Sequence, residues 1–100
     1  MIEIEVAGGR LTVRGVLDDK AEAGFRDGLR RLLRSDPSAV TVDLVGVEAI
    51  TSVCVGALVA MWVDLREAGG TLTLRASPAV KKTLDMTGLT SPLMGASPGR

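Results

Sequence analysis

Two adjacent hydroxyl side chains, Thr51 and Ser52, stand at the start of a stretch without charge that runs from 49 to 63. A hydroxyl at a helix start can accept a hydrogen bond from a free backbone N–H, which caps the helix with about 1 kcal/mol. The same place suits a phosphate, because free N–H groups and the helix dipole stabilise negative charge. Two roles therefore stay open for Ser52, or for Thr51 in its place: a helix cap or a phosphorylation site.

Other reactive side chains are scarce. The chain has no His and a single Cys, Cys54, so it lacks the commonest general base, an internal disulfide and a cysteine-based zinc site. We expect Cys54 to be a small buried apolar residue. Twelve Lys and Arg balance twelve Asp and Glu, and the two aromatic residues are too few to stack bases. These features predict no enzyme, no metal or cofactor and no nucleic-acid partner, and they favour a protein that contacts other proteins.

The uncharged stretch also raises the question of a membrane. It lies between Glu48 and Asp64 and is shorter than the roughly 20 apolar residues that a spanning helix needs. The first residues include Glu3 and Glu5, where a signal peptide would carry basic residues. We therefore predict no membrane span and a cytoplasmic location.

Seven elements are expected in the order β-β-α-β-α-β-α, from alternating apolar residues in strands and apolar residues three and four apart in helices. The predicted bounds are strands at 2–6, 10–16, 39–45 and 71–75, and helices at about 19–34, 52–68 and 78–88. The nearly continuous apolar run at 39–45 favours a parallel strand with two buried faces. The fold class is α/β: a sandwich with a mixed four- to five-stranded sheet, an N-terminal hairpin and three main helices packed on it. One domain is predicted over 1–90, with a flexible C-terminal tail over 91–100.

The predicted helix at 52–68 has one apolar stripe more than it needs to cover a sheet. The first stripe contains Cys54, Leu58, Met61 and Leu65, and the second contains Val55, Val59 and Val63. The second stripe packs against Phe25 and Leu29 of the helix at 19–34, or it forms an exposed patch that docks another protein. The two alternatives are compatible if only residues 53–57 of the helix reach solvent.

Five segments spread over nearly the whole chain share a distinctive pattern. They are LTVRGVLD at 11–18, VDLVGV at 42–47, GAL at 56–58, AGGTL at 68–72 and, most specifically, SPAVKKTLDMTGL at 77–89. Together they resemble the STAS domain family, the SpoIIAA-like anti-sigma-factor antagonists and their relatives. The resemblance implies a STAS-like sandwich.

The resemblance also implies a phosphorylation switch. In this family the loop before the central helix usually reads Asp-Ser-Ser-Gly-x-Gly, and a partner serine kinase phosphorylates the first Ser. Here Ser52 falls on the phosphorylated position and Gly56 on the last glycine, whereas Thr51, Val53 and Cys54 replace the Asp, the second Ser and the first Gly.

On this resemblance, the chain is expected to be an anti-sigma-factor antagonist. It would bind an anti-sigma factor or serine protein kinase and so release a sigma factor. The expected contact residues are Thr51, Ser52, Val53, Val55, Gly56 and Val59, with Ser52, or alternatively Thr51, as the phosphorylated residue. The altered motif favours a second hypothesis, a STAS subunit that is not phosphorylated, in a larger complex such as a lipid-transport ATPase or a stressosome-like assembly. A homodimer stays open as a further partner.

Overall fold

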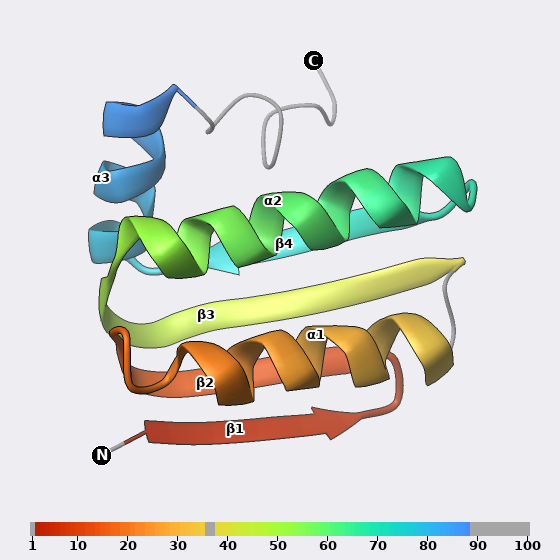
Figure 1. Cartoon of the computed structure of the whole chain (residues 1–100), viewed down its shortest axis with the longest axis horizontal. Helices are drawn as coiled ribbons and strands as arrows, with labels where there is room; N and C mark the ends of the chain where they lie inside the picture. Colours follow the sequence, from red (N-terminus) through yellow and green to blue (C-terminus); the bar gives the residue numbers. More distant parts are fainter. Residues whose placement is uncertain (1, 36–37, 89–100) are drawn as a thin grey trace.

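Four strands form one mixed sheet in the order β1-β2-β3-β4 in the computed structural model, which describes residues 2–35 and 38–88 (Figure 1). The strands are β1 Ile2–Ala7, β2 Arg10–Leu17, β3 Ala39–Ile50 and β4 Thr71–Ala76. β1 and β2 pair antiparallel as the predicted hairpin, while β3 runs parallel to both β2 and β4. The predicted mixed sheet with an N-terminal hairpin is confirmed. The tail predicted at 91–100 lies outside the described residues.

Three helices complete the predicted order. They are α1 Glu22–Ser35, α2 Ser52–Glu67 and α3 Pro78–Thr87. α1 and α2 lie side by side over one face of the sheet, with α1 over β1 and β2 and α2 against β4 (Figure 1). α3 packs mainly against β3. Because α1 and α2 cover the same face of the sheet, these two helices form one layer and the sheet forms the other.

The second face of β3 is open, which corrects the expectation of two buried faces. Val40, Val42 and Leu44 point into the core, whereas Thr41 and Asp43 are half-buried and Val45 is 52% exposed. The neighbouring strands continue this open face with charged side chains, among them the ion pairs Arg10–Asp43 and Arg14–Glu3. A sheet that is covered on one side only shows this alternation of apolar and polar residues.

β3 does not end at Val45 as predicted but continues to Ile50. Gly46, the residue just after the predicted end, lies inside the strand, where the register with β2 shifts twice. A Cβ atom on Gly46 would lie 2.8 Å from Cγ of Arg14, so the glycine makes room for the arginine stem that crosses it. This extension carries the chain to the very start of α2.

The starts of α1 and α3 have visible causes. α1 begins at Glu22, three residues later than predicted, because Oδ1 of Asp18 accepts hydrogen bonds from the backbone N–H groups of Lys20 and Ala21, both at 3.1 Å, and holds a turn there. α3 begins as expected, since Oγ of Ser77 accepts a hydrogen bond from the N–H of Val80 at 3.2 Å.

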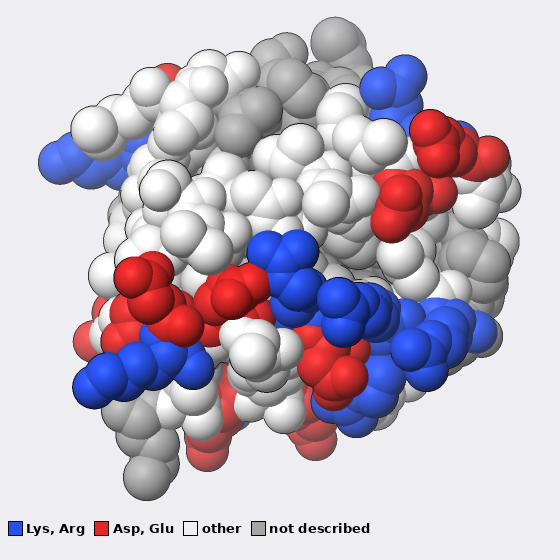
Figure 2. Space-filling view, viewed as in Figure 1, with Lys and Arg blue, Asp and Glu red and all other residues white. Residues whose placement is uncertain are grey.

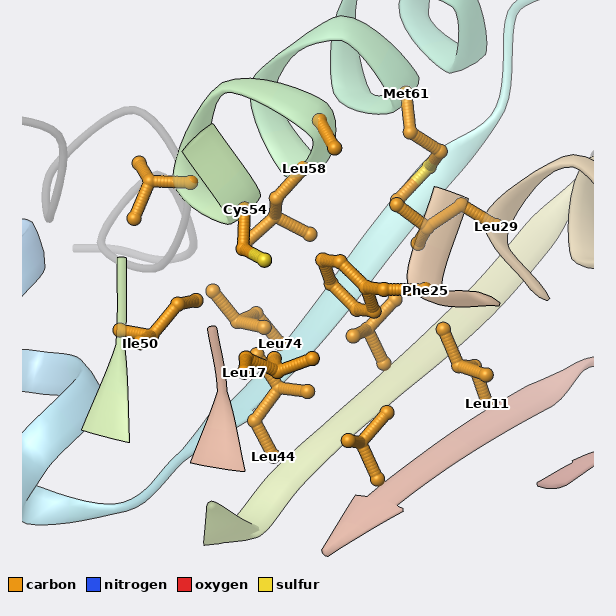
Figure 3. Packing of buried hydrophobic residues seen from close by; sticks show 14 of the residues in the cluster. Leu11, Leu17, Phe25, Leu29, Leu44, Ile50, Cys54, Leu58, Met61 and Leu74 are labelled. Atoms are coloured by element: carbon orange, nitrogen blue, oxygen red, sulfur yellow. The ribbon is translucent and has the colours of Figure 1, made fainter. Parts of the chain in front are cut away.

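The core lies between the sheet and the two long helices. The ring of Phe25 is fully buried and extends from α1 toward Leu58 and Met61 of α2, above the leucines of the strands (Figure 3). This packing fixes where α2 sits on the sheet. The position of its first residue is therefore determined by the core.

Candidate functional site

The start of α2 is held by a one-residue connection. β3 ends at Ile50 and α2 begins at Ser52. Thr51, between them, donates its backbone N–H to the carbonyl of Leu17 at 2.9 Å and accepts a hydrogen bond from the N–H of Val55 at 3.0 Å. The end of β2 and the first turn of α2 therefore hold this corner in place.

The residue at the cap position of α2 makes no side-chain cap hydrogen bond, although the sequence allowed for one. Thr51 occupies the cap position, but its hydroxyl makes no cap hydrogen bond. Within the described residues its Oγ1 is buried and has no hydrogen-bond partner. Ser52 is already the first helical residue and is exposed. The first turn also contains no acidic residue, so the positive end of the helix dipole is left without a compensating charge on the helix itself.

Cys54 lies behind this turn and is fully buried, as predicted. Its Sγ lies 3.6 Å from the carbonyl oxygen of Asp18. Burial raises the pKa of the Cys54 thiol, and the carboxylates of Glu22, Asp19 and Asp18 raise it further. The thiol therefore stays protonated, and the start of α2 has an acidic neighbour in the β2–α1 turn.

The outer side of α2 is apolar and accessible. Val53 is 46% exposed and Val63 is 41% exposed, with Gly56 exposed and Val59 half-buried between them. Figure 2 shows an uncharged area over α2, bordered by the charged side chains of α1. Exposed apolar areas with a charged rim are typical of protein contact sites.

Two expectations about the valine stripe are wrong. Val55 is only 3% exposed and belongs to the core, so it is not available to a partner as predicted. Nor does the stripe pack against α1, because the side of α2 toward α1 carries Ala57, Ala60 and Asp64. At about 100° per residue, Val59 lies on the other side of the helix.

The structure also has a groove between α1 and α2 that the sequence did not lead us to expect. It holds about 170 Å³ and is lined by Arg26, Leu29, Arg30 and Leu33 of α1 and by Ala57, Ala60, Met61 and Asp64 of α2. Two signals for it are present in the sequence: arginines four residues apart on α1, and the two small residues of α2 that leave space beside them.

Neither a membrane helix nor a metal cluster is found in the described part of the chain. No helix within 2–35 and 38–88 is long and apolar enough to cross a membrane. In the same residues, no three His, Cys, Asp or Glu side chains lie together in a way that could hold a metal ion.

The family model described as "Mlab, STAS domain" matches residues 1–95. The chain belongs to the STAS domain family. No curated protein sequence matches this STAS domain significantly.

Solved structures resemble the STAS domain over most of its length. An anti-sigma factor antagonist from Mycobacterium paratuberculosis is 25% identical, with a TM-score of 0.73 over 93% of this chain and 81% of that chain. The anti-sigma factor antagonist SpoIIAA, solved in its unphosphorylated form, is 21% identical, with a TM-score of 0.71 over 94% of this chain and 85% of that chain. A candidate anti-sigma factor antagonist from Thermotoga maritima is 18% identical, with a TM-score of 0.75 over 93% and 83% of the two chains. The last two similarities concern the fold alone.

Proposed function

We propose that this STAS domain is a cytoplasmic anti-sigma-factor antagonist that binds an anti-sigma factor or serine protein kinase through the start of α2. The contact is made by Ser52, Val53, Gly56 and Val59, here called the α2 docking surface. The observation that carries the proposal is an exposed serine beside an exposed valine at a helix start that no side chain caps. The similarity to an anti-sigma factor antagonist at 25% identity supports it.

Phosphorylation of Ser52 turns the binding off in this proposal. Ser52 is an exposed residue, whereas Oγ1 of Thr51 is buried, which favours Ser52 over Thr51 as the acceptor. A phosphate brings roughly two negative charges, and the free N–H groups of the first turn stabilise it within the domain. The same charge next to Val53 repels an apolar partner surface, and it adds to the carboxylates of the β2–α1 turn.

The phosphorylation step is tested with the cognate serine kinase. The folded protein is incubated with that kinase, ATP and Mg²⁺, and the phosphate is located by mass spectrometry. We expect phosphate on Ser52 in the wild type and in Thr51→Val, and none in Ser52→Ala. Phosphate on Thr51 alone, or no incorporation, would contradict the switch.

A second candidate function is a STAS subunit that stays bound in a larger complex without phosphorylation. The motif change at Val53 favours it, because this side chain replaces a serine and is 46% exposed. The matching family model is described as "Mlab, STAS domain", a description that does not mention anti-sigma factors. Genes for transporter subunits beside this one support the second function, and genes for a kinase and a sigma factor support the first.

A further inference from the structure

We propose that the groove between α1 and α2 receives an apolar anchor side chain from an acidic amphipathic helix of the docking partner. This inference rests on the proposed function, because it names the chemistry of the partner that meets the α2 docking surface. The groove lies on the α1 side of that surface and adjoins it through Ala60, which lines the groove and is exposed.

The size of the groove selects the kind of occupant. Its volume of about 170 Å³ is below the roughly 300–1,000 Å³ of sites that enclose drug-sized ligands. It is close to the roughly 150 Å³ of an apolar cavity that admits one benzene molecule. One large apolar side chain, such as Leu, Phe or Met, therefore fills it. The floor suits such a side chain, because Leu29, Ala57 and Met61 are apolar and buried.

The charges at the rim select the partner's flanking residues. On the α1 side the rim carries Arg26 and Arg30, whose spacing of four places them on the same side of the helix. Arg26 is already paired with Glu22. Arg30 is exposed and forms no ion pair with any other residue in 2–35 and 38–88. An Asp or Glu on the partner, next to its anchor, completes this site.

The opposite rim sets the orientation of the partner. Asp64 of α2 is the acidic residue among the lining side chains. Like charges placed face to face disfavour a wrong partner or a reversed orientation. The partner helix therefore turns its acidic side toward α1, and its side toward α2 is neutral or basic. A helix fits better than an extended strand, because α1 and α2 run side by side (Figure 1) and about two turns of each, 26–33 and 57–64, line the groove.

The probes for this proposal are two synthetic helical peptides with the same row of leucines. One carries Glu along the flank that faces α1, and the other carries Lys there. Binding to the full chain is measured by calorimetry, and its place is mapped by NMR shifts of the amides of Leu33, Ala57 and Ala60. We expect the Glu peptide to shift these amides and to bind about tenfold more tightly than the Lys peptide.

Variants of the chain locate the interaction. Arg30→Glu should weaken binding of the Glu peptide about tenfold, and Ala60→Leu, which fills an exposed part of the groove, should weaken it similarly. Arg31→Glu is the matched control: it makes the same change in charge, but Arg31 does not line the groove and pairs with Asp27 on α1 at 3.2 Å. The control should bind like the wild type.

Four results would overturn the proposal: equal binding of both peptides, no binding of either, equal effects of Arg30→Glu and Arg31→Glu, or shifts of the groove amides that depend on protein concentration without peptide. The last result would identify a second copy as the occupant. Neither peptide needs Ser52 or a kinase. A failure of the phosphorylation test therefore leaves this result intact, and a failure here leaves that test intact.

Discussion

Gly46 shows how a single missing side chain shapes the sheet. It lies in β3 opposite Arg14 of β2, and the arginine stem occupies the space that a Cβ atom would need. Gly56 offers the opposite case, because a Cβ atom there would meet nothing within 4 Å. The same substitution should therefore have effects of opposite sign at the two glycines.

Gly46→Ala should lower the free energy of unfolding by about 1–3 kcal/mol, as other overpacking changes do. Gly56→Ala should raise it by up to about 1 kcal/mol, because Ala favours a helix. Urea denaturation measures both. In an Arg14→Ala background, the loss of unfolding free energy caused by Gly46→Ala should fall to well under half of its value in the wild type, since the contacting Cγ atom is gone. An unchanged cost in that background would contradict the steric explanation.

The lowered pKa of Asp43 predicts that part of the free energy of unfolding is lost in acid. The N–H of Val45 donates to its Oδ1 at 3.0 Å, and this bond, together with Arg10, lowers the pKa of the carboxyl group. A lowered folded-state pKa means that the stabilising contribution is complete above the pKa of an unfolded Asp, about 3.9, and is lost as the pH falls through the lower, folded-state value.

Asp43→Asn should therefore unfold more easily than the wild type at pH 7, and the difference should shrink steadily below about pH 4. Urea denaturation across this pH range measures it. A difference between the two proteins that stays constant from neutral to strongly acidic pH would show that the Asp43 charge is not the cause.

At the scale of elements, the two serines at helix starts have different roles. Oγ of Ser77 donates to the carbonyl of Val47 at 2.6 Å and also caps α3, so it ties this helix to the extended part of β3. Ser52 is exposed, and the start of its helix has no side-chain cap. Both serines lie at helix starts, but only Ser77 makes side-chain hydrogen bonds that hold the fold together.

Ser77→Ala should cost about 1–3 kcal/mol of unfolding free energy, because it removes a cap and leaves a buried carbonyl without its donor. Ser52→Ala should change it by less than about 0.5 kcal/mol. Thermal and urea denaturation of the two variants make the comparison. Equal losses would mean that Ser52 is needed for folding, which would weaken its assignment as a switch.

Sequence patterns predicted the elements well where local rules decide. The N-terminal hairpin and the start of α3 at Pro78 are examples. The patterns failed where a distant residue decides. The predicted strand ended at Val45, but β3 continues through Gly46, whose partner Arg14 lies on another strand. Likewise, Val55 and Val59 belong to one stripe in the sequence, but only the structure separates the buried Val55 from the half-buried Val59.

At the scale of the whole molecule, the sheet has an open edge at β1 that resists pairing with itself. Glu3 and Glu5 alternate with apolar residues along this edge strand. An antiparallel pair of β1 strands centred on Ile4 would place Glu3 of each copy opposite Glu5 of the other. Like charges directly opposite each other destabilise a strand pair. The homodimer that the sequence left open is therefore not expected at this edge.

Glu5→Lys should strengthen self-association of the chain about tenfold, because each of the two pairs centred on Ile4 changes from repulsion to attraction, at up to roughly 1 kcal/mol per pair. Sedimentation equilibrium measures the association. Glu48→Lys is the matched control, since it makes the same charge change at an exposed residue of the internal strand β3. Equal association of the two variants would exclude the edge as the cause.

The position of the candidate site was predictable from the sequence, but its accessible side was not. The family motif placed Ser52 and Gly56, and both are exposed. Which valines reach solvent depends on how α2 is rotated on the sheet. Phe25 and the strand leucines determine that rotation, and no local pattern contains it.

The central claim is that the start of α2 docks a partner and that charge at Ser52 releases it. The most direct measurement is the affinity of the cognate anti-sigma factor for the wild type, Ser52→Ala, Ser52→Asp and Thr73→Asp, which introduces the same charge at an exposed residue of β4 on the open face of the sheet. We expect Ser52→Asp to weaken binding by at least about tenfold, and both Ser52→Ala and Thr73→Asp to bind like the wild type. Unchanged affinity of Ser52→Asp, or an equal loss in Thr73→Asp, would contradict the claim.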